Sequence, residues 1–263
     1  MAITTLDGLV AALATGLQRS YHKKSVTSFG AGFAHSLWNV AGAPGTGYIP
    51  VTGSGELCSV STTGAIPFTN SGTSYLAQAS FCSSTSGRLI LYDRLWANSG
   101  MSGTMAVTNN IDTPPDLNRP DSTGSNTELW AEVYATIGNT AATLTVNYTN
   151  QNGDSKTGTY VKATGQPIAG TMLPISLASG DTGVRKVVSY SWSVSTGTAG
   201  NFGFTILRKI AEIPLNIVNN GTTLDFADLG LPIINNSACI TAMILASTIN
   251  TGFVIGSFTI AQG

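Results

Sequence analysis

Short stretches in which apolar and polar residues alternate recur along most of this chain, and they constrain its fold more than any other feature. The clearest lies at residues 188–194, where Val188, Tyr190, Trp192 and Val194 alternate with serines. Successive side chains of a β-strand point to opposite faces of a sheet, so this period of two residues predicts a strand with one face in the core. The chain is therefore expected to be built mainly from strands.

Further runs of the same kind predict a series of short strands separated by glycine, asparagine and proline turns. The pair Asn152-Gly153 lies between two of them and is the preferred sequence for a type I′ hairpin turn. Many short strands joined in this way are typical of an all-β fold, here an antiparallel, jelly-roll-like β-sandwich. The additional strands are predicted at residues 88–96, 128–137, 144–148, 156–162, 202–207, 233–234, 239–246 and 253–260.

One short helix is predicted over residues 5–18. Thr4 or Thr5 can cap it, and Asp7 lies in the first turn, where the helix dipole favours a carboxylate. A helix this short is marginal on its own, so its apolar face must dock on the β domain or on a neighbouring subunit. That face has the 3.6-residue period of a helix and consists of Leu6, Leu9, Val10, Leu13 and Leu17.

The segment that follows this helix is rich in glycine, proline, serine and threonine as far as about residue 64. Residues 38–47 read as consecutive turns. An irregular stretch of this length predicts an extended N-terminal arm or a functional loop. Its aromatic side chains are expected to be buried, some of them across a subunit contact. Together with the helix, the arm supplies the predicted interface residues: Leu6, Leu9, Leu13, Leu17, Phe29, Phe33, Leu37, Trp38 and Tyr48.

The predicted domain organisation follows from this arm. Residues 1–48 are expected to form the N-terminal helix and arm, and residues 49–263 the β-sandwich domain. Residues 109–126 contain three prolines and almost no apolar side chains. They are either a seam inside the sandwich domain or a long surface loop.

The surface of this chain is expected to be polar but nearly uncharged. Charged residues make up 10% of the sequence and hydrophobic residues 42%, and the net charge is −1. Direct binding of nucleic acid is disfavoured, because contacts to phosphates need clustered lysine and arginine. The one basic cluster, residues 19–24, is either a solvated helix end or a grip on an acidic neighbour. A surface of this kind costs little to desolvate and suits protein contacts.

Segments that would direct the chain to a membrane or out of the cell are not recognisable in the sequence. No apolar run is long enough to span a membrane, and residues 1–5 lack the basic and apolar regions of a secretory signal. Cys58, Cys82 and Cys239 are too far apart for a CxxC pair and odd in number, so buried, reduced thiols are expected. These features predict assembly in a reducing cytoplasm.

Motifs for catalysis are also missing, so the chain is predicted not to be an enzyme and to bind no cofactor or metal. His22 and His35 lack further ligands at the spacing of a metal site. The sequence has no GxSxG, HExxH, Walker A or GxGxxG pattern. Asp112, Asp116 and Asp121 fall in one stretch but without the spacing of an EF-hand.

A pair of carboxylates, Glu128 and Glu132, is the strongest catalytic candidate, because both should share one strand face with Trp130. Glycosidases place two carboxylates around the scissile bond. Positions four apart on a strand, however, are separated by roughly 13 Å, more than either glycosidase mechanism uses. The interpretation favoured by the sequence is therefore a solvated outer face or a subunit contact.

Several segments without catalytic signatures resemble capsid-associated proteins of tailed bacteriophages. The resemblance implies a decoration (cement) or minor capsid protein on the capsid surface, assembled in the host cytoplasm. It also implies contact with the major capsid protein and self-association, commonly as a homotrimer at three-fold positions. The segments are residues 35–38 (HSLW), 41–45 (AGAPG), 64–68 (GAIPF), 89–96 (LILYDRLW), 146–153 (VNYTNQNG) and 196–203 (TGTAGNFG).

An alternative from another class is a tail-fibre or lectin-like module that recognises glycans on the host surface. Trp130, Tyr134 and the nearby carboxylates would serve it if they were exposed. A polysaccharide-cleaving enzyme is a third alternative, which an activity screen on host capsule would test. Copy number separates the first two, because a cement protein is present in hundreds of copies per particle and a tail protein in a dozen or fewer.

Overall fold

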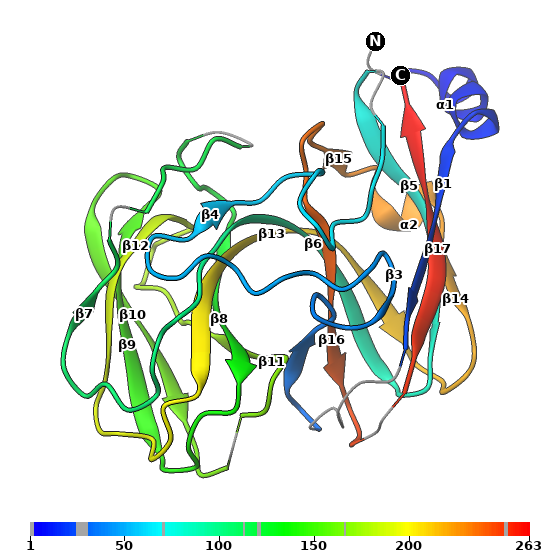
Figure 1. Cartoon of the computed structure of the whole chain (residues 1–263). Helices are drawn as coiled ribbons and strands as arrows, with labels where there is room; N and C mark the ends of the chain where they lie inside the picture. Colours follow the sequence, from blue (N-terminus) through cyan, green and yellow to red (C-terminus); the bar gives the residue numbers. More distant parts are fainter. Residues whose placement is uncertain are drawn as a thin grey trace. The chain divides into compact units, whose positions relative to one another are not determined.

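The all-β, antiparallel prediction is confirmed in a computed structural model of the chain (Figure 1). The structure describes residues 3–24, 31–69, 72–112, 114–119, 122–165, 167–249 and 252–263. Among them, helix is confined to α1 (Leu6–Ala14) and α2 (Phe226–Leu229).

The chain divides into two compact units, at boundaries that differ from those predicted. Unit 1 combines Met1–Tyr48, Ser59–Asp93 and Ile210–Gly263, and unit 2 combines Ile49–Cys58 with Arg94–Lys209. The first 48 residues are therefore part of a unit that also draws on the middle and the end of the sequence. The predicted seam at residues 109–126 lies within unit 2, where its Ile111 and Leu117 are buried in the core.

Unit 1 is a two-layered β structure. We call its larger layer the β17 sheet. Inward side chains of this sheet, such as Phe81 and Phe258, share one core with those of β16 and β6, such as Ile244 and Leu91. β16 pairs with both β2 and β6. The β17 sheet has the order β14 (Thr222–Leu224), β5 (Ser74–Ser83), β17 (Val254–Gln262), β1 (Leu17–Lys23) and β3 (Gly42–Ala43), with β15 (Ile233–Ile234) also paired to β5. The other strands of the unit are β2 (Ala34–Ser36), β16 (Ile240–Ala246), the first part of β6 (Gly87–Ala97) and, from Ile210 onward, the last part of β13 (Asn201–Leu215).

Unit 2 is likewise built from antiparallel strands around its own core. We call one of its sheets the β9 sheet. In the core of unit 2, Phe202 lies edge-to-face against Tyr190, Trp192 and Phe204, and the distances between ring centroids are 5.4, 5.8 and 5.7 Å. The β9 sheet has the order β10 (Ser155–Lys162), β9 (Ala142–Asn150), β12 (Val184–Trp192) and β7 (Asn109–Asn110). The remaining strands are β8 (Glu128–Ala135), paired with β11 (Thr171–Pro174) and β13 (Asn201–Leu215), and β4 (Glu56–Leu57), paired with β6.

The N-terminal helix is shorter than predicted. Thr5 caps α1 by accepting a hydrogen bond from the Gly8 amide, as expected, but the helix ends at Ala14. Leu17 belongs to β1, because residues 17–23 pair along their whole length with β17, and these long-range hydrogen bonds override the helical pattern. The buried face of α1 consists of Leu9 and Ala12, which pack on Ala77 and Ala261 of the sheet.

The predicted extended arm is folded into unit 1. Leu37 and Trp38 are each only 1% exposed, and the Trp38 indole nitrogen donates a hydrogen bond of 2.9 Å to the Tyr48 carbonyl. The turn-rich segment after Trp38 wraps around the buried Lys23 side chain. The Lys23 Nζ donates hydrogen bonds of 3.0, 2.8 and 3.2 Å to the carbonyls of Val40, Pro44 and Gly45. Chain that would otherwise be irregular is held in place by this ammonium group.

This buried lysine predicts a pH-dependent contribution to stability. Burial lowers the pKa of Lys23 from its ordinary value of 10.5 to about 8. The unfolded chain therefore binds this proton over a pH range where the folded chain has released it, so the free energy of unfolding rises with pH between these two values. Between about pH 7 and about pH 9.5, the free energy of unfolding of the natural protein is expected to rise by about 2 kcal/mol more than that of Lys23→Met.

Urea unfolding of both proteins at the two pH values measures this difference. Tyr21, whose ring centroid lies 5.8 Å from the Lys23 Nζ, does not obscure it. Burial raises the pKa of Tyr21 above its ordinary value of 10.0, so the stability linked to it is lost only above that pH. A difference between the two proteins that stays constant with pH would contradict the prediction.

The predicted strands form, but three details differ. One is that β12 ends at Trp192, so Val194, which the alternation placed in the core, lies beyond the strand and is 47% exposed. β9 and β10 form the predicted hairpin, but Gly153 alone has a positive φ, 90°, so the turn is not of type I′, which needs a positive φ at Asn152 as well. In β12, the pairing with β9 is shifted between Val187 and Ser189. This bulge buries Val187 and turns Val188 outward, although the sequence pattern placed Val188 in the core.

Candidate interaction surfaces

Several loops at one end of unit 1 carry exposed apolar side chains. Phe33, Ile217, Val218 and Ile249 are 47, 62, 45 and 73% exposed. We call these four residues the apolar loop end. It lies opposite the end of the unit that carries α1, where β5 and β16 end and β17 begins (Figure 1).

Backbone hydrogen bonds hold these loops to one another. The Asn219 amide, next to Val218, donates to the Ser83 carbonyl at 2.8 Å. The Ser84 amide donates to the Phe253 carbonyl at 3.1 Å, which links the same turn to the loop of Ile249. The Gly32 amide, next to Phe33, donates to the carbonyl of Ala246 at 2.8 Å. These hydrogen bonds therefore connect the segments that carry the exposed apolar side chains.

The loops at this end also carry paired hydroxyl groups, of which that of Thr85 is buried. Ser86 and Ser247 share a hydroxyl hydrogen bond of 2.6 Å, and Thr85 and Thr248 share one of 3.0 Å. Hydroxyl groups paired with each other cost less to remove from water than charged side chains do. The arrangement suits contact with another protein, because apolar anchors are surrounded by groups that can be desolvated.

A second, mostly neutral surface is the outward side of the β9 sheet, apart from Lys186, which lies opposite Thr149 and pairs with Asp116. Thr145 pairs with Thr159 on one side and Ser191 on the other, so one row across three strands carries only hydroxyl groups. In the next row the Asn147 amide donates to the Ser189 hydroxyl at 2.8 Å and accepts from the Thr157 hydroxyl at 3.0 Å. These neutral side chains satisfy one another across the sheet.

The β17 sheet repeats this feature in unit 1. Ser20, Ser257, Ser80 and Thr223 form one row across four strands, and the hydroxyls of Ser80 and Thr223 lie 2.8 Å apart. The low charge of the sequence therefore reflects two outward sheet faces of serine and threonine. Such faces offer many hydrogen-bond donors and acceptors and no net charge.

The predicted interface residues are not brought together into one surface. Leu9, Leu37 and Trp38 are buried within unit 1, and Leu13 and Leu17 pack partly against its clusters, so these five stabilise the fold. Phe29 lies outside the described residues. The exposed members are Leu6 (65%), Phe33 (47%) and Tyr48 (37%), of which Phe33 belongs to the apolar loop end. The sequence did not single out Ile217, Val218 or Ile249, although each is an aliphatic residue within a turn-rich stretch.

The predicted carboxylate face of β8 is largely buried. Glu132 is 0% exposed and its Oε2 lies 2.7 Å from Nη1 of the buried Arg94. The Tyr134 hydroxyl donates to the same carboxylate oxygen at 3.0 Å and accepts from Arg94 Nη2 at 3.1 Å. Glu132 and Tyr134 therefore cannot form the solvated face or the exposed glycan platform that the sequence allowed. Glu128 instead accepts a 2.8 Å hydrogen bond from the Trp130 indole.

The electrostatics of this group fit a permanent ion pair. Burial alone would lower the pKa of Arg94, but the Glu132 carboxylate outweighs it and holds that pKa well above its ordinary value. Burial, together with the same carboxylate, raises the pKa of Tyr134. Arg94 thus stays protonated and Tyr134 neutral, and neither side chain is exposed to a substrate.

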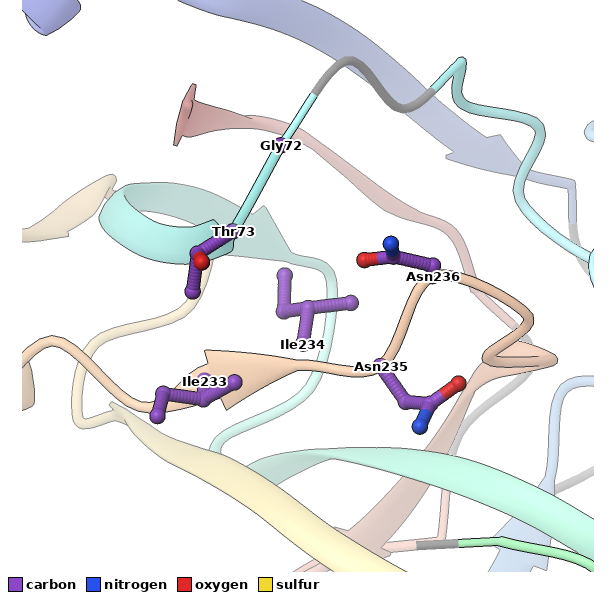
Figure 2. A pocket seen from close by; sticks show the side chains of 6 residues that line it. All are labelled: Gly72, Thr73, Ile233, Ile234, Asn235 and Asn236. Atoms are coloured by element: carbon purple, nitrogen blue, oxygen red, sulfur yellow. The ribbon is translucent and has the colours of Figure 1, made fainter. Parts of the chain in front are cut away.

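A pocket of about 460 Å³ lies at the opposite end of unit 1 from the apolar loop end (Figure 2). Figure 2 shows Thr73 and Asn236 at opposite sides of the pocket with Ile234 between them. The Asn235 side chain accepts a 2.9 Å hydrogen bond from the Ser237 amide, which fixes one edge of the pocket. Its lining is neutral and polar, with Gly72 and Ile233 completing it.

The remaining candidates from the sequence are dispersed. His22 is exposed and His35 buried, and Cys58 and Cys239 are buried while Cys82 is half-buried. Within the described ranges, no three histidine, cysteine or acidic side chains are grouped closely enough to hold a metal ion. No helix in the described part of the chain has the length and apolarity needed to cross a membrane.

Comparison with known proteins yields only distant similarity. No protein-family model matches the chain, and no curated protein sequence matches it. A crystal structure of the infectious bursal disease virus VP2 subviral particle is similar at 9% identity, with 94% of this chain and 80% of that chain covered and a TM-score of 0.22. A structure of the Gx strain of the same virus is similar at 10% identity, with 94 and 81% covered and a TM-score of 0.21. Scores this low assign neither a family nor a function, and the resemblance to phage capsid-associated proteins stays a prediction.

Proposed function

We propose that this chain is a non-enzymatic structural protein of a bacteriophage virion, which decorates and stabilises the capsid. In this proposal it associates with itself, as a homotrimer, and binds the major capsid protein at the capsid surface. The observation that carries the proposal is the apolar loop end, because several exposed apolar side chains at one end of a unit are typical of sites of protein contact. The serine- and threonine-rich faces of the two sheets give further neutral surface.

The energetics favour such a role. Burying one exposed aliphatic side chain stabilises a contact by about 1.5–3 kcal/mol before the costs of association. Ile217 and Ile249 are the most exposed members of the apolar loop end and therefore gain most. The neutral hydroxyl groups around them form a rim that excludes water without the cost of desolvating charges.

Substitution of the apolar loop end tests this surface. The Ile217→Ser/Ile249→Ser variant is expected to bind capsids that lack the protein at least tenfold more weakly, because about 1.4 kcal/mol of contact energy corresponds to one order of magnitude. Co-sedimentation with such capsids measures the affinity, and light scattering of the purified protein measures self-association.

Val107→Ser is the matched control. Val107 and Ile217 are 63 and 62% exposed, but Val107 lies in unit 2, outside the strands of the β9 sheet. The control is expected to bind and associate like the natural protein. Equal binding by both variants would show that the apolar loop end is not part of the interface.

The composition of purified virions tests the role itself. A decorating protein is present on the order of hundreds of copies per particle, whereas a dozen or fewer would place it in the tail. Quantitative mass spectrometry against the major capsid protein gives this number. Virions without the chain would overturn the proposal.

Glycan recognition is the second candidate, and the neutral pocket of unit 1 favours it. Amide and hydroxyl groups such as those of Asn236 and Thr73 suit the uncharged hydroxyls of a sugar. Binding of host surface polysaccharide that is lost in Asn236→Ala would support this candidate. Unchanged binding in the variant would show that the glycan binds outside this pocket. Absence of binding by the natural protein would contradict glycan recognition.

A further inference from the structure

The sequence contains two Asn-Gly pairs, Asn152-Gly153 and Asn220-Gly221, and both lie in exposed loops. The first is in the loop between β9 and β10, and the second is in the loop between β13 and β14. The two pairs have the same side chains, so a difference in their reactivity must come from the structure around each pair.

An Asn-Gly pair can react with itself. The glycine backbone nitrogen attacks the asparagine Cγ, and glycine allows this because it has no Cβ to restrict the backbone. The N–Cγ bond forms, the glycine amide proton passes to base in the solvent, and the Cγ–Nδ2 bond breaks as Nδ2 takes up a proton from the solvent and leaves as ammonia. Water then opens the cyclic imide at either carbonyl and leaves aspartate or isoaspartate.

The backbone at Gly153 opposes this reaction. The Gly153 amide donates a 3.0 Å hydrogen bond to the Asn150 carbonyl, so its nitrogen is engaged within the turn. Asn150 is 1% exposed, and its side-chain oxygen accepts from the amides of Asn152 and Asp154 at 3.0 and 2.9 Å. Attack would require this network to open.

The backbone at Gly221 offers no such protection. Gly221 is exposed, and a Cβ added to it would meet no atom within 4 Å. Among the described residues, no backbone acceptor lies within hydrogen-bonding distance of its amide. Asn220 is also exposed, with its own amide donating to the Ile217 carbonyl at 3.2 Å. The nitrogen that must attack therefore belongs to an exposed residue and, within the described part of the chain, is not engaged by a backbone carbonyl.

We propose that Asn220 is a site of spontaneous deamidation in the folded protein and that Asn152 is protected from the same reaction by its turn. The product places a carboxylate two residues from Val218, within the loop that carries part of the apolar loop end. Under the proposed function this charge weakens the contact of aged protein with its partner. That consequence rests on the proposed function, whereas the reaction itself does not.

Peptide mapping of the purified full-length chain tests the reaction without any capsid. After incubation at mildly alkaline pH, the peptide containing Asn220 is expected to convert to aspartate and isoaspartate several-fold faster than the peptide containing Asn152. In concentrated urea the two rates are expected to converge, because only the folded turn protects Asn152. Equal rates in the folded protein, faster conversion of Asn152 or no conversion would each overturn the proposal.

Gly221→Ala is the matched variant, because the space around Gly221 accommodates the added methyl group. It is expected to slow conversion at Asn220 and leave the rate at Asn152 unchanged. Conversion at Asn220 that is as fast in this variant would show that the glycine nitrogen is not the attacking group. Capsid binding by protein aged to completion then tests the consequence separately.

Discussion

Replacing Glu132 with glutamine is expected to destabilise the protein by roughly 3–5 kcal/mol, because it leaves the buried Arg94 guanidinium without its carboxylate. Arg94 and Glu132 are 1 and 0% exposed, and β8 has strands paired on both sides at Glu132, so water cannot replace the lost charge. The glutamine amide oxygen can still accept hydrogen bonds from Tyr134 and Arg94, so the variant removes the negative charge while keeping an acceptor.

Urea unfolding followed by fluorescence measures the loss. The double variant Arg94→Met/Glu132→Leu is the control, and it is expected to recover most of the stability, since an apolar pair of similar volume leaves no buried charge. Glu132 Oε1 has no hydrogen-bond partner among the described residues, so little hydrogen bonding is given up there. A single variant within about 1 kcal/mol of the natural protein would contradict the prediction.

Replacing Phe202 with alanine is expected to cost roughly 3–5 kcal/mol, because it opens a cavity at the centre of unit 2. Phe202 is fully buried and lies edge-to-face against Tyr190, Trp192 and Phe204, so three favourable ring contacts disappear with it. Hydrogen exchange, read separately for the peptides of each unit, shows where protection is lost, and the largest loss is expected in β12 and β13.

Phe33→Ala is the control for this substitution. It removes the same side chain from the surface of unit 1, where Phe33 is 47% exposed, and is expected to change stability by no more than about 0.5 kcal/mol. Comparable losses in both variants would mean that the aromatic cluster of unit 2 is not the core that its burial indicates.

The strands of unit 2 could be predicted well because their periodicity is local. Tyr190 and Trp192 alternate with serines, and both are buried. Periodicity failed where the backbone departs from regular pairing, as at Val188, since a bulge shifts every following side chain. It also failed for β5, where a similar shift lies opposite Thr259 and Ile260 and the strand is rich in small residues.

The candidate surfaces could not be predicted because they depend on contacts between distant parts of the chain. Ile217 and Ile249 lie at the same end of unit 1 only after β14 and β17 have both paired with β5. The burial of Glu132 likewise depends on Arg94, which lies on another strand. From the alternating pattern alone, such a carboxylate is predicted to face the solvent. Leu37 and Trp38 were correctly expected to be buried, but within their own unit.

The position of β17 in its sheet determines when unit 1 can be completed during synthesis of the chain. This strand lies between β5 and β1 in the sheet, yet it comes later in the sequence than every other strand. Residues 94–209 of unit 2 can leave the ribosome and pair among themselves before β17 is synthesised. Until β17 emerges, the edges of β1 and β5 that will pair with it have no partner strand. Unit 1 is therefore completed only once β17 has emerged, and a nascent chain that stops before β17 exposes two unpaired strand edges to chaperones and to aggregation.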